Sequence, residues 1–282
     1  MTISRTISHL IEPQHTIEGA GVLLRRSIAP RVSNEYDPFL LFDHFAFNKP
    51  IEGPPVGFPL HPHRGIETVT YMLEGSVNHR DSLGNAGLIG PGDVQWMTSG
   101  RGIMHEEMPR RGASGIINGF QLWVNLPAAQ KMIAPRYQEV NAATIPTVTH
   151  NGVAVRLVAG GFNGRLGPVT EIAASPLYME VNLSPASSFN ISIPRGHTAL
   201  AYLFEGSGRF GANRDEVESV MMVVFDDGDQ IEVESENGAR FMLIAGAPFG
   251  EPIAPYGPFV MNTPQEIQQA LMELRNGTFI KP

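Results

Sequence analysis

The chain has 282 residues, no cysteine, 17% charged residues and a formal net charge of −8. The missing cysteines exclude disulfides, thiolate catalysis and cysteine-based zinc sites, so any metal must be held by His, Asp or Glu. The acidic balance, without a basic run, argues against direct nucleic-acid binding, and the 30 Gly and 23 Pro favour a β-rich protein.

The first residues, MTISRTISHLIEPQHT, are interrupted by Arg5, His9 and Glu12 and lack the apolar core of a signal peptide. No apolar run approaches the roughly 20 residues of a membrane-spanning helix. We therefore expect a cytoplasmic protein without membrane contact, or a nuclear one as well if the source is eukaryotic.

A repeat suggests two domains, which the length also favours. YMLEG at Tyr71–Gly75 recurs as YLFEG at Tyr202–Gly206, and each copy is followed by a Gly-Asp pair and a strand-like run. The proline-bearing stretch 125–152 reads as the connection. We predict an N-terminal domain at residues 1–138 and a C-terminal domain at residues 139–282.

Strand patterns support a β-rich second copy. Residues 153–161 (VAVRLVAGG) and 189–193 (FNISI) read as strands. Residues 229–246 read as two strands joined by Asn237-Gly238, a pair suited to a type I′ hairpin turn.

One helix is well marked near the C-terminus. Thr263 is the expected N-cap, Pro264 takes the first helical position and Glu266 completes a capping box. Apolar residues then recur with helical spacing from Ile267, and Gly277 supplies the stop.

Two histidines stand out in the stretch LHPHRGIETVTYMLEG. His61 and His63 are two residues apart, so in a strand their side chains share one face. We expect them to begin a strand, where Pro62 is tolerated. An H-x-H pair by itself fits a metal site and an ordinary pair of side chains about equally well.

The stretch GRGIMHEEM offers a second such pair, His105 and Glu107. Two strands that each offer two ligands could meet across a barrel interior and surround a metal ion with open coordination positions. Nitrogen and oxygen donors fit Fe(II), Mn, Ni, Cu(II) or Zn without choosing among them. A surface carboxylate is the alternative for Glu107, and Glu106 is its neighbour, but strand parity with His105 favours Glu107. The remaining histidines are expected outside the site: His9, His15, His44, His79, His150 and His197.

The motifs HPHRGIETVTYMLEG, PGDVQWMTSGRGIMHEEMP, FQLWVNLP and IAGAPFGEPIAPYGPFVMNT resemble the pirin family of bicupins. The resemblance implies an all-β fold of two cupin (jelly-roll) β-barrels, here with the short C-terminal helix. It also implies one metal ion, usually iron, in the N-terminal domain. The implied ligands are His61, His63, His105 and Glu107, with Glu67 as a candidate for outer support. The second copy lacks an H-x-H pair, so we expect no metal there.

Pirins resemble quercetin 2,3-dioxygenases, which implies a flavonol-like substrate, O2 and ring opening with loss of carbon monoxide. Glu107 would be the catalytic base that accepts the proton of the flavonol hydroxyl group. Apolar residues near the ligands could wall a pocket or belong to the core: Phe58, Ile66, Met97 and Met104.

The alternative function is a non-enzymatic regulator whose metal state controls binding to a transcription factor or a metabolic enzyme. Arg64 would relay the metal's charge to the surface in that case. An ordinary solvated or salt-bridged arginine is the simpler interpretation of this residue.

Overall fold

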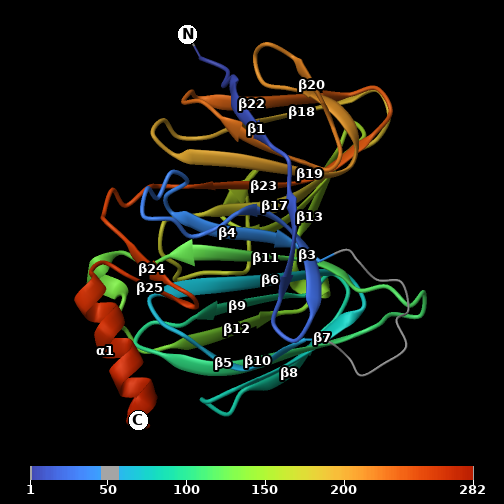
Figure 1. Cartoon of the computed structure of the whole chain (residues 1–282). Helices are drawn as coiled ribbons and strands as arrows, with labels where there is room; N and C mark the ends of the chain where they lie inside the picture. The colour runs from blue at the N-terminus through green and yellow to red at the C-terminus, as the bar shows by residue number, and fades with distance from the viewer. Residues whose placement is uncertain (1, 46–56, 282) are drawn as a thin grey trace. The chain divides into compact units, whose positions relative to one another are not determined.

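The computed structural model describes residues 2–45 and 57–281. Its described residues form two compact units (Figure 1). The larger unit combines residues 14–142 with 249–282, and the smaller unit combines residues 1–13 with 143–248. The units therefore differ from the contiguous ranges 1–138 and 139–282, because each end of the chain joins the unit built mainly from the other half. Strand pairing between distant segments produces this exchange, and no local sequence pattern encodes it.

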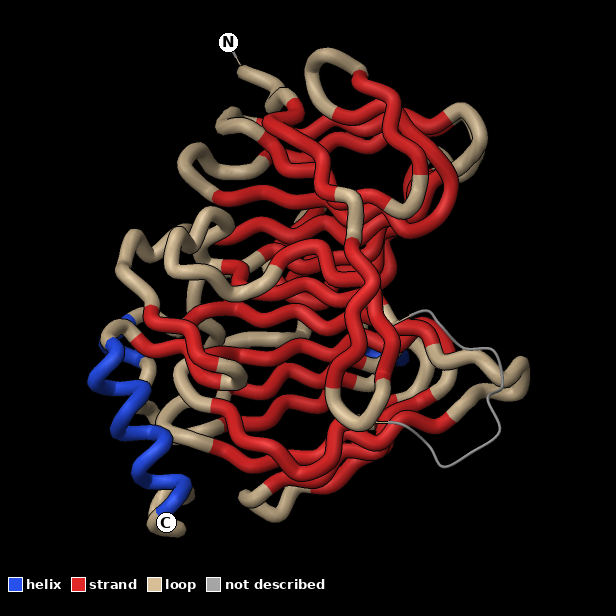
Figure 2. Tube along the Cα trace, viewed as in Figure 1, coloured by secondary structure: helices blue, strands red, loops and turns tan. Residues whose placement is uncertain are grey.

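Strands make up nearly all the regular structure, and a single α-helix lies near the C-terminus of the described chain (Figure 2). This confirms the expected all-β class with a short C-terminal helix. Two short 3-10 helices complete the elements, η1 (Ala128–Gln130) and η2 (Ala142–Thr144).

The larger unit contains an antiparallel sheet of seven strands. The strands, in spatial order, are β12 (Arg136–Val140), β9 (Val94–Thr98), β6 (Ile66–Glu74), β11 (Asn118–Asn125), β4 (Phe39–His44), β3 (Val22–Ile28) and β2 (Gln14–Glu18).

Cross-strand register aligns four polar side chains of this sheet. Thr70 on β6 pairs with Gln121 on β11, Gln121 pairs with Asp43 on β4, and Asp43 pairs with Arg26 on β3. Because paired residues project on the same side of a sheet, these four residues form one row on one face. We call them the polar row.

A second sheet of the larger unit has four strands. They are, in spatial order, β5 (Phe58–His63), β10 (Ile103–Arg110), β7 (Ser76–Asp81) and β8 (Ala86–Ile89). Thr70 of the polar row donates a hydrogen bond to Glu107 on β10, so the polar row faces this second sheet across the interior of the unit.

The C-terminal part of the larger unit comprises the strand pair β24 (Ala254–Tyr256) and β25 (Phe259–Met261), then α1 (Pro264–Arg275). The expected capping box is present, because Thr263 accepts from the backbone of Glu266 while the Glu266 carboxylate accepts from the backbone of Thr263. The buried face of α1, at Ile267 and Ala270, packs with side chains of β25.

The smaller unit is also built from antiparallel strands. Its main path runs β1 (Ile7–Ile11), β21 (Met221–Phe225), β19 (Thr198–Phe210), β23 (Ala239–Gly246), β17 (Leu177–Leu183), β14 (Val153–Ala159) and β13 (Thr147–His150). Further strands are β18 (Ser187–Ser192), β20 (Asp215–Glu218), β22 (Gln230–Ser235), β15 (Gly161–Phe162) and β16 (Arg165–Leu166). Buried hydrophobic side chains, including Phe189, Phe210 and Phe241, fill its core.

The predicted strands at residues 153–161 and 189–193 correspond to β14 and β18, but the predicted hairpin at Asn237-Gly238 is wrong. β22 pairs with β18 and β19, whereas β23 pairs with β17 and β19. Asn237 is absent from the described residues with positive φ, which a type I′ turn requires at both central positions. The turn instead uses Gly238, whose backbone N–H donates to Ser235 Oγ at 2.9 Å.

A buried lysine provides a test of this architecture. The Lys131 side chain is 1% exposed, and its Nζ donates to the Gly65 and Val260 carbonyl oxygens and to Asn125 Oδ1. Lys131→Met removes three buried hydrogen bonds at once, so we expect the free energy of unfolding to fall by about 3 kcal/mol in urea denaturation.

Lys281→Met is the matched control, because Lys281 is 37% exposed and, among the described residues, makes a single ion pair, with Glu273. The free energy of unfolding of Lys281→Met should lie less than about 1 kcal/mol below that of the wild type. Equal losses for the two variants would contradict the role given to Lys131.

Candidate metal centre

His61 and His63 lie at the end of β5, not at the start of a strand as expected. The chain turns at Gly65, whose φ is +81°, before β6 begins. A Cβ at Gly65 would collide with the Val260 carbonyl oxygen, so the close approach of the Val260 backbone requires glycine at the turn between β5 and β6. The apolar run after the histidines is therefore a separate strand.

β5 and β10 are hydrogen-bonded neighbours, so the expected meeting of two strands across a barrel interior is wrong. His61 is the direct cross-strand partner of His105. The expected shared face of His105 and Glu107 is confirmed, because both are buried while the intervening Glu106 is less so. The register shifts between His105 and Glu107, where β10 bulges against β5.

The three histidine rings converge on one point. Ring centroids are 4.9 Å apart for His61 and His63, 4.3 Å for His61 and His105, and 4.9 Å for His63 and His105. One ring nitrogen from each histidine lies within 4.8 Å of the other two, which makes this triad the candidate metal group within residues 2–45 and 57–281.

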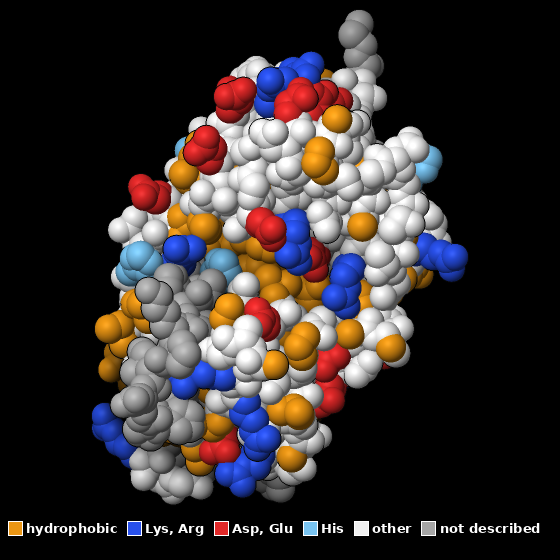
Figure 3. All heavy atoms as spheres, turned by 90° about the vertical axis from the view of Figure 1, so that its right-hand side faces the viewer, with side chains coloured by type: hydrophobic (Ala, Val, Ile, Leu, Met, Phe, Trp, Pro, Cys, Tyr) orange, Lys and Arg blue, Asp and Glu red, His pale blue; other side chains and the backbone are white. Residues whose placement is uncertain are grey.

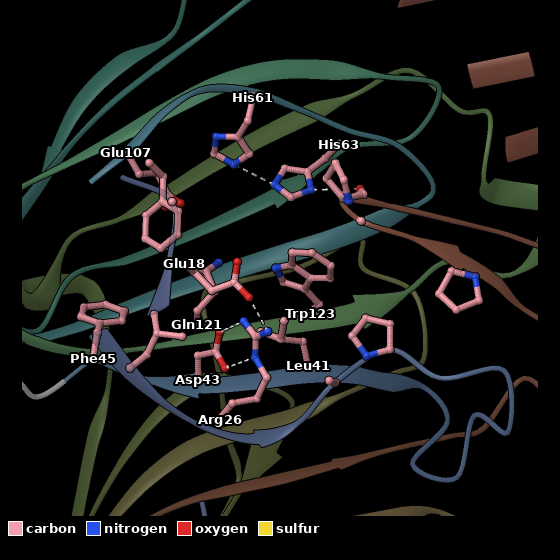
Figure 4. A pocket seen from close by; sticks show the side chains of 18 of the residues that line it. Glu18, Arg26, Leu41, Asp43, Phe45, His61, His63, Glu107, Gln121 and Trp123 are labelled. Carbon is pink, nitrogen blue, oxygen red and sulfur yellow. Dashed lines mark hydrogen bonds and ion pairs between the residues drawn. The ribbon is translucent and has the colours of Figure 1, made fainter. Parts of the chain in front are cut away.

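Hydrogen bonds to backbone carbonyls orient two of the rings. His61 Nδ1 lies 2.9 Å from the Pro59 oxygen, and His63 Nδ1 lies 3.2 Å from the Pro258 oxygen. Because a carbonyl oxygen can only accept, both protons must sit on Nδ1, and both Nε2 atoms carry lone pairs. These Nε2 atoms face each other at 3.1 Å (Figure 4). Two facing lone pairs repel, so this arrangement fits a bound cation.

His105 gives a second indication that this site suits a metal ion. Its side chain is fully buried, and neither ring nitrogen has a hydrogen-bond partner among the described residues. Buried imidazole nitrogens are normally satisfied, and a metal ion would bind one of them. Burial lowers the pKa of His63 to about 3 and holds the pKa of His105 well below its usual value, so both rings are neutral near pH 7. Neutral imidazole is the form that binds metals.

Glu107 lies in the wall of the same cavity but outside the group of converging nitrogens. Its carboxylate is 6% exposed, and Oε1 accepts a 2.8 Å hydrogen bond from Thr70 Oγ1. Burial raises the pKa of Glu107 to about 7, and the Thr70 hydrogen bond partly opposes this shift. The structure thus unites the three predicted histidines and places the predicted carboxylate nearby.

Sequence reasoning missed His79, which it assigned to a polar loop. His79 lies on β7, is 1% exposed, and has its ring 5.4 Å from that of His105. Its Nδ1 lies 2.9 Å from Gln95 Nε2 on the facing sheet. The available signal was strand spacing, because His79 lies two residues after the apolar Val77 and both side chains are buried on the same face of β7. Trp123, whose ring meets that of His63 edge-on at 5.2 Å, had no such signal because only tertiary packing brings the two together.

Two other candidates have structural explanations. Glu67 accepts from Thr98 Oγ1 at 2.7 Å and lies on the face of β6 opposite Thr70, because the turn at Gly65 breaks its parity with His63. Arg64 is 1% exposed and donates to Glu273 at 2.5 Å, as expected for a salt-bridged arginine.

A cavity of about 660 Å³ opens beside the histidines. Phe58 lines it, whereas Ile66 and Met97 are fully buried in the core, and Met104 packs against the cluster around β25 and α1. His44, expected outside the site, has its Nε2 within hydrogen-bond distance of Asn118 Oδ1, at 3.0 Å.

The surface in Figure 3 intersperses basic and acidic side chains, and hydrophobic side chains gather in a hollow on that face. No helix in residues 2–45 or 57–281 is both long and apolar enough to cross a membrane.

The raised pKa of Glu107 predicts a pH-dependent stability of the metal-free protein. The folded pKa of about 7 exceeds the ordinary value of 4.5, so the folded state binds the proton more tightly. This contribution is complete below about pH 4.5 and is lost as the pH rises through about 7. Metal-free Glu107→Gln should therefore exceed the wild type in free energy of unfolding by about 2 kcal/mol at pH 8, and match it at pH 4.

Urea denaturation with a chelator measures this difference, and Glu106→Gln, on the opposite face of β10, should not show it. Adding a divalent metal at pH 8 should stabilise the wild type more than Glu107→Gln. Equal stabilisation of the two proteins would remove Glu107 from the ligand set.

Comparisons with known proteins identify the family of this chain. A family model for pirin matches residues 21–124, and a model for the pirin C-terminal cupin domain matches residues 178–280. Human pirin is 41% identical over 281 residues, covering 98% of this chain and 94% of the human protein. A pirin-like protein of Caulobacter vibrioides is 41% identical over 277 residues, covering 98% of this chain and 99% of that protein.

Two solved structures are also similar to this chain. The crystal structure of a quercetin 2,3-dioxygenase from Acinetobacter baumannii matches with a TM-score of 0.89 and 31% identity, covering 98% of each chain. The bacterial pirin YhhW from Escherichia coli, in complex with nickel(II), matches with a TM-score of 0.64 and 22% identity, covering 85% of this chain and 99% of that one, which is a likeness of fold. The chain belongs to the pirin family and consists of two cupin domains with a short C-terminal helix.

Proposed function

We propose that this chain is a metal-dependent dioxygenase that opens the heterocycle of a quercetin-like flavonol with O2. The observation that carries the proposal is the convergence of the His61, His63 and His105 nitrogens beside an open cavity. The similarity to a quercetin 2,3-dioxygenase over nearly the whole chain supports the choice of reaction.

The proposed metal ligands are His61, His63, His105 and Glu107. We take Fe(II) as the metal to test first, and Mn, Ni, Cu and Zn as alternatives, because nitrogen and oxygen donors suit all of them. When bound, a divalent ion would act as a Lewis acid toward the 3-hydroxyl group of the flavonol and its neighbouring oxygen.

Glu107 is the proposed base for the flavonol hydroxyl proton. A carboxyl group with a pKa near 7 is suited to accepting and returning a proton near neutral pH. The hydrogen bond from Thr70 fixes one carboxylate oxygen, which leaves the other to receive the proton. The electron-rich flavonol anion then reacts with O2, and the ring opens with loss of carbon monoxide.

The cavity suits a flat aromatic substrate. Its volume of about 660 Å³ lies within the usual range of ligand pockets, roughly 300–1,000 Å³. Leu41, Phe58 and Trp123 supply apolar surface for the rings.

The test begins with metal analysis of protein purified without an affinity tag. Near-stoichiometric metal should be present in the wild type and lost in His61→Ala, because that change removes one of three converging nitrogens. O2 consumption and carbon monoxide release with quercetin should be measurable in the wild type and fall to the enzyme-free rate in His61→Ala. His150→Ala, an exposed histidine at the end of β13, is the control and should keep both metal and activity.

Metal that persists in His61→Ala would overturn the site. Loaded protein that consumes no O2 with any flavonol would overturn the dioxygenase and turn attention to regulation through a protein partner. In that case, partner binding should depend on the oxidation state of the metal.

A further inference from the structure

The cavity beside the histidines has a second polar wall. Figure 4 shows His61 and His63 on one side of the cavity, and Glu18, Arg26 and Asp43 on the other. We call these last three residues the acid–arginine cluster. Apolar side chains such as Leu41 and Trp123 also line the cavity. A ligand that reaches both walls must therefore be polar at both ends and apolar in its middle.

Ion pairs hold the acid–arginine cluster in place. Arg26 donates from Nε to Asp43 Oδ1 at 2.8 Å and from Nη2 to Asp43 Oδ2 at 2.7 Å, a bidentate pair. Its Nη1 donates to Glu18 Oε1 at 2.7 Å. Two carboxylates and one guanidinium give the cluster a net charge of −1. The Asp43 side chain is 5% exposed, that of Arg26 is 23% exposed and that of Glu18 is 42% exposed, so Asp43 anchors the cluster inside the molecule and Glu18 is its most accessible member.

This wall keeps unused hydrogen-bonding capacity. Arg26 has five N–H groups, and three of them bond within the cluster. No structured residue accepts from the other two, and none donates to the second oxygen of Glu18. Gln121, the neighbour of Asp43 in the polar row, has its side-chain oxygen 3.2 Å from Thr70 Oγ1, but Thr70 has a single proton and gives it to Glu107. The amide N–H groups of Gln121 have no acceptor within the described chain.

Donors and an acceptor side by side suit a hydroxyl group, which donates and accepts at once. The net negative charge disfavours a carboxylate or phosphate at this position. Phenolic hydroxyls on a flat aromatic ligand satisfy both conditions.

We propose that Glu18, Arg26 and Gln121 form a recognition subsite for phenolic hydroxyl groups at the end of the substrate remote from the histidines. The subsite selects flavonols that carry hydroxyls on the pendant phenyl ring. This proposal rests on the proposed function and extends it, because it names the part of the substrate that the enzyme recognises.

Two ligands test the subsite: quercetin, which has two hydroxyls on the pendant phenyl ring, and the flavonol that differs only in lacking them. Equilibrium dialysis of the metal-loaded full chain without O2 gives binding, and O2 consumption gives turnover separately. The wild type should bind quercetin at least about tenfold more tightly than the flavonol without these hydroxyls, as expected when a charged partner accepts a hydroxyl hydrogen bond. We call this ratio of the two affinities the selectivity ratio.

Glu18→Ala should reduce this ratio to about twofold or less, since it removes the acceptor while the buried Arg26–Asp43 pair stays intact. Gln121→Leu, which keeps the volume but loses the amide, should reduce it as well. Glu205→Ala is the matched control, because Glu205 also pairs with an arginine, Arg240, at 2.9 Å but belongs to the smaller unit. Its ratio should equal that of the wild type.

The outcomes separate the two proposals. An unchanged ratio in both Glu18→Ala and Gln121→Leu overturns the subsite and leaves the dioxygenase intact. A ratio that depends on Glu18, together with no O2 consumption, supports the subsite and overturns the dioxygenase. A wild type that prefers the unhydroxylated ligand overturns the subsite, and one that binds neither ligand overturns both.

Discussion

The site depends on two hydrogen bonds that fix where the imidazole protons lie. His61 and His63 each give the Nδ1 proton to a backbone carbonyl, so both Nε2 lone pairs must point at the same space. A side-chain acceptor could rotate or protonate, whereas the backbone carbonyls of Pro59 on β5 and of Pro258 between β24 and β25 cannot. The chemical character of the cavity follows, since one wall presents fixed lone pairs to a cation and the opposite wall presents one arginine between two carboxylates.

The residues around the C-terminus are part of this arrangement. Pro258 supplies the carbonyl for His63, and Val260 supplies one of the acceptors for the buried Lys131. Arg64, directly after His63, pairs with Glu273 on α1. The helix carries no chemistry of its own, but it closes a set of contacts that hold the end of β5 in position. The packing of the C-terminal segment therefore helps to fix the position of the histidines at the end of β5.

Sequence patterns predict what depends on neighbours along the chain. The face shared by His105 and Glu107, and the capping box of α1, both follow from local spacing, and both are present. The pairing of β5 with β10, the role of Pro258 and the cluster around Arg26 depend on segments far apart in sequence, so no local signal contains them. The exchange of chain ends between the two units depends on such distant segments as well. The Asn237-Gly238 pair shows the limit of a local turn signal, which specified neither the type of turn that forms nor the strands that pair.

The exchange of chain ends has a consequence for the order of events during synthesis. Residues are made from the N-terminus, yet the carbonyl that orients His63 belongs to Pro258, in the segment 249–282 that completes the larger unit. Both histidines of β5 leave the ribosome long before this partner exists. His61 has its acceptor, the Pro59 carbonyl oxygen, only two residues away, whereas the Nδ1 proton of His63 gains its acceptor only when translation is almost finished. The proposed metal site is therefore complete only after the C-terminal segment has been made and has folded.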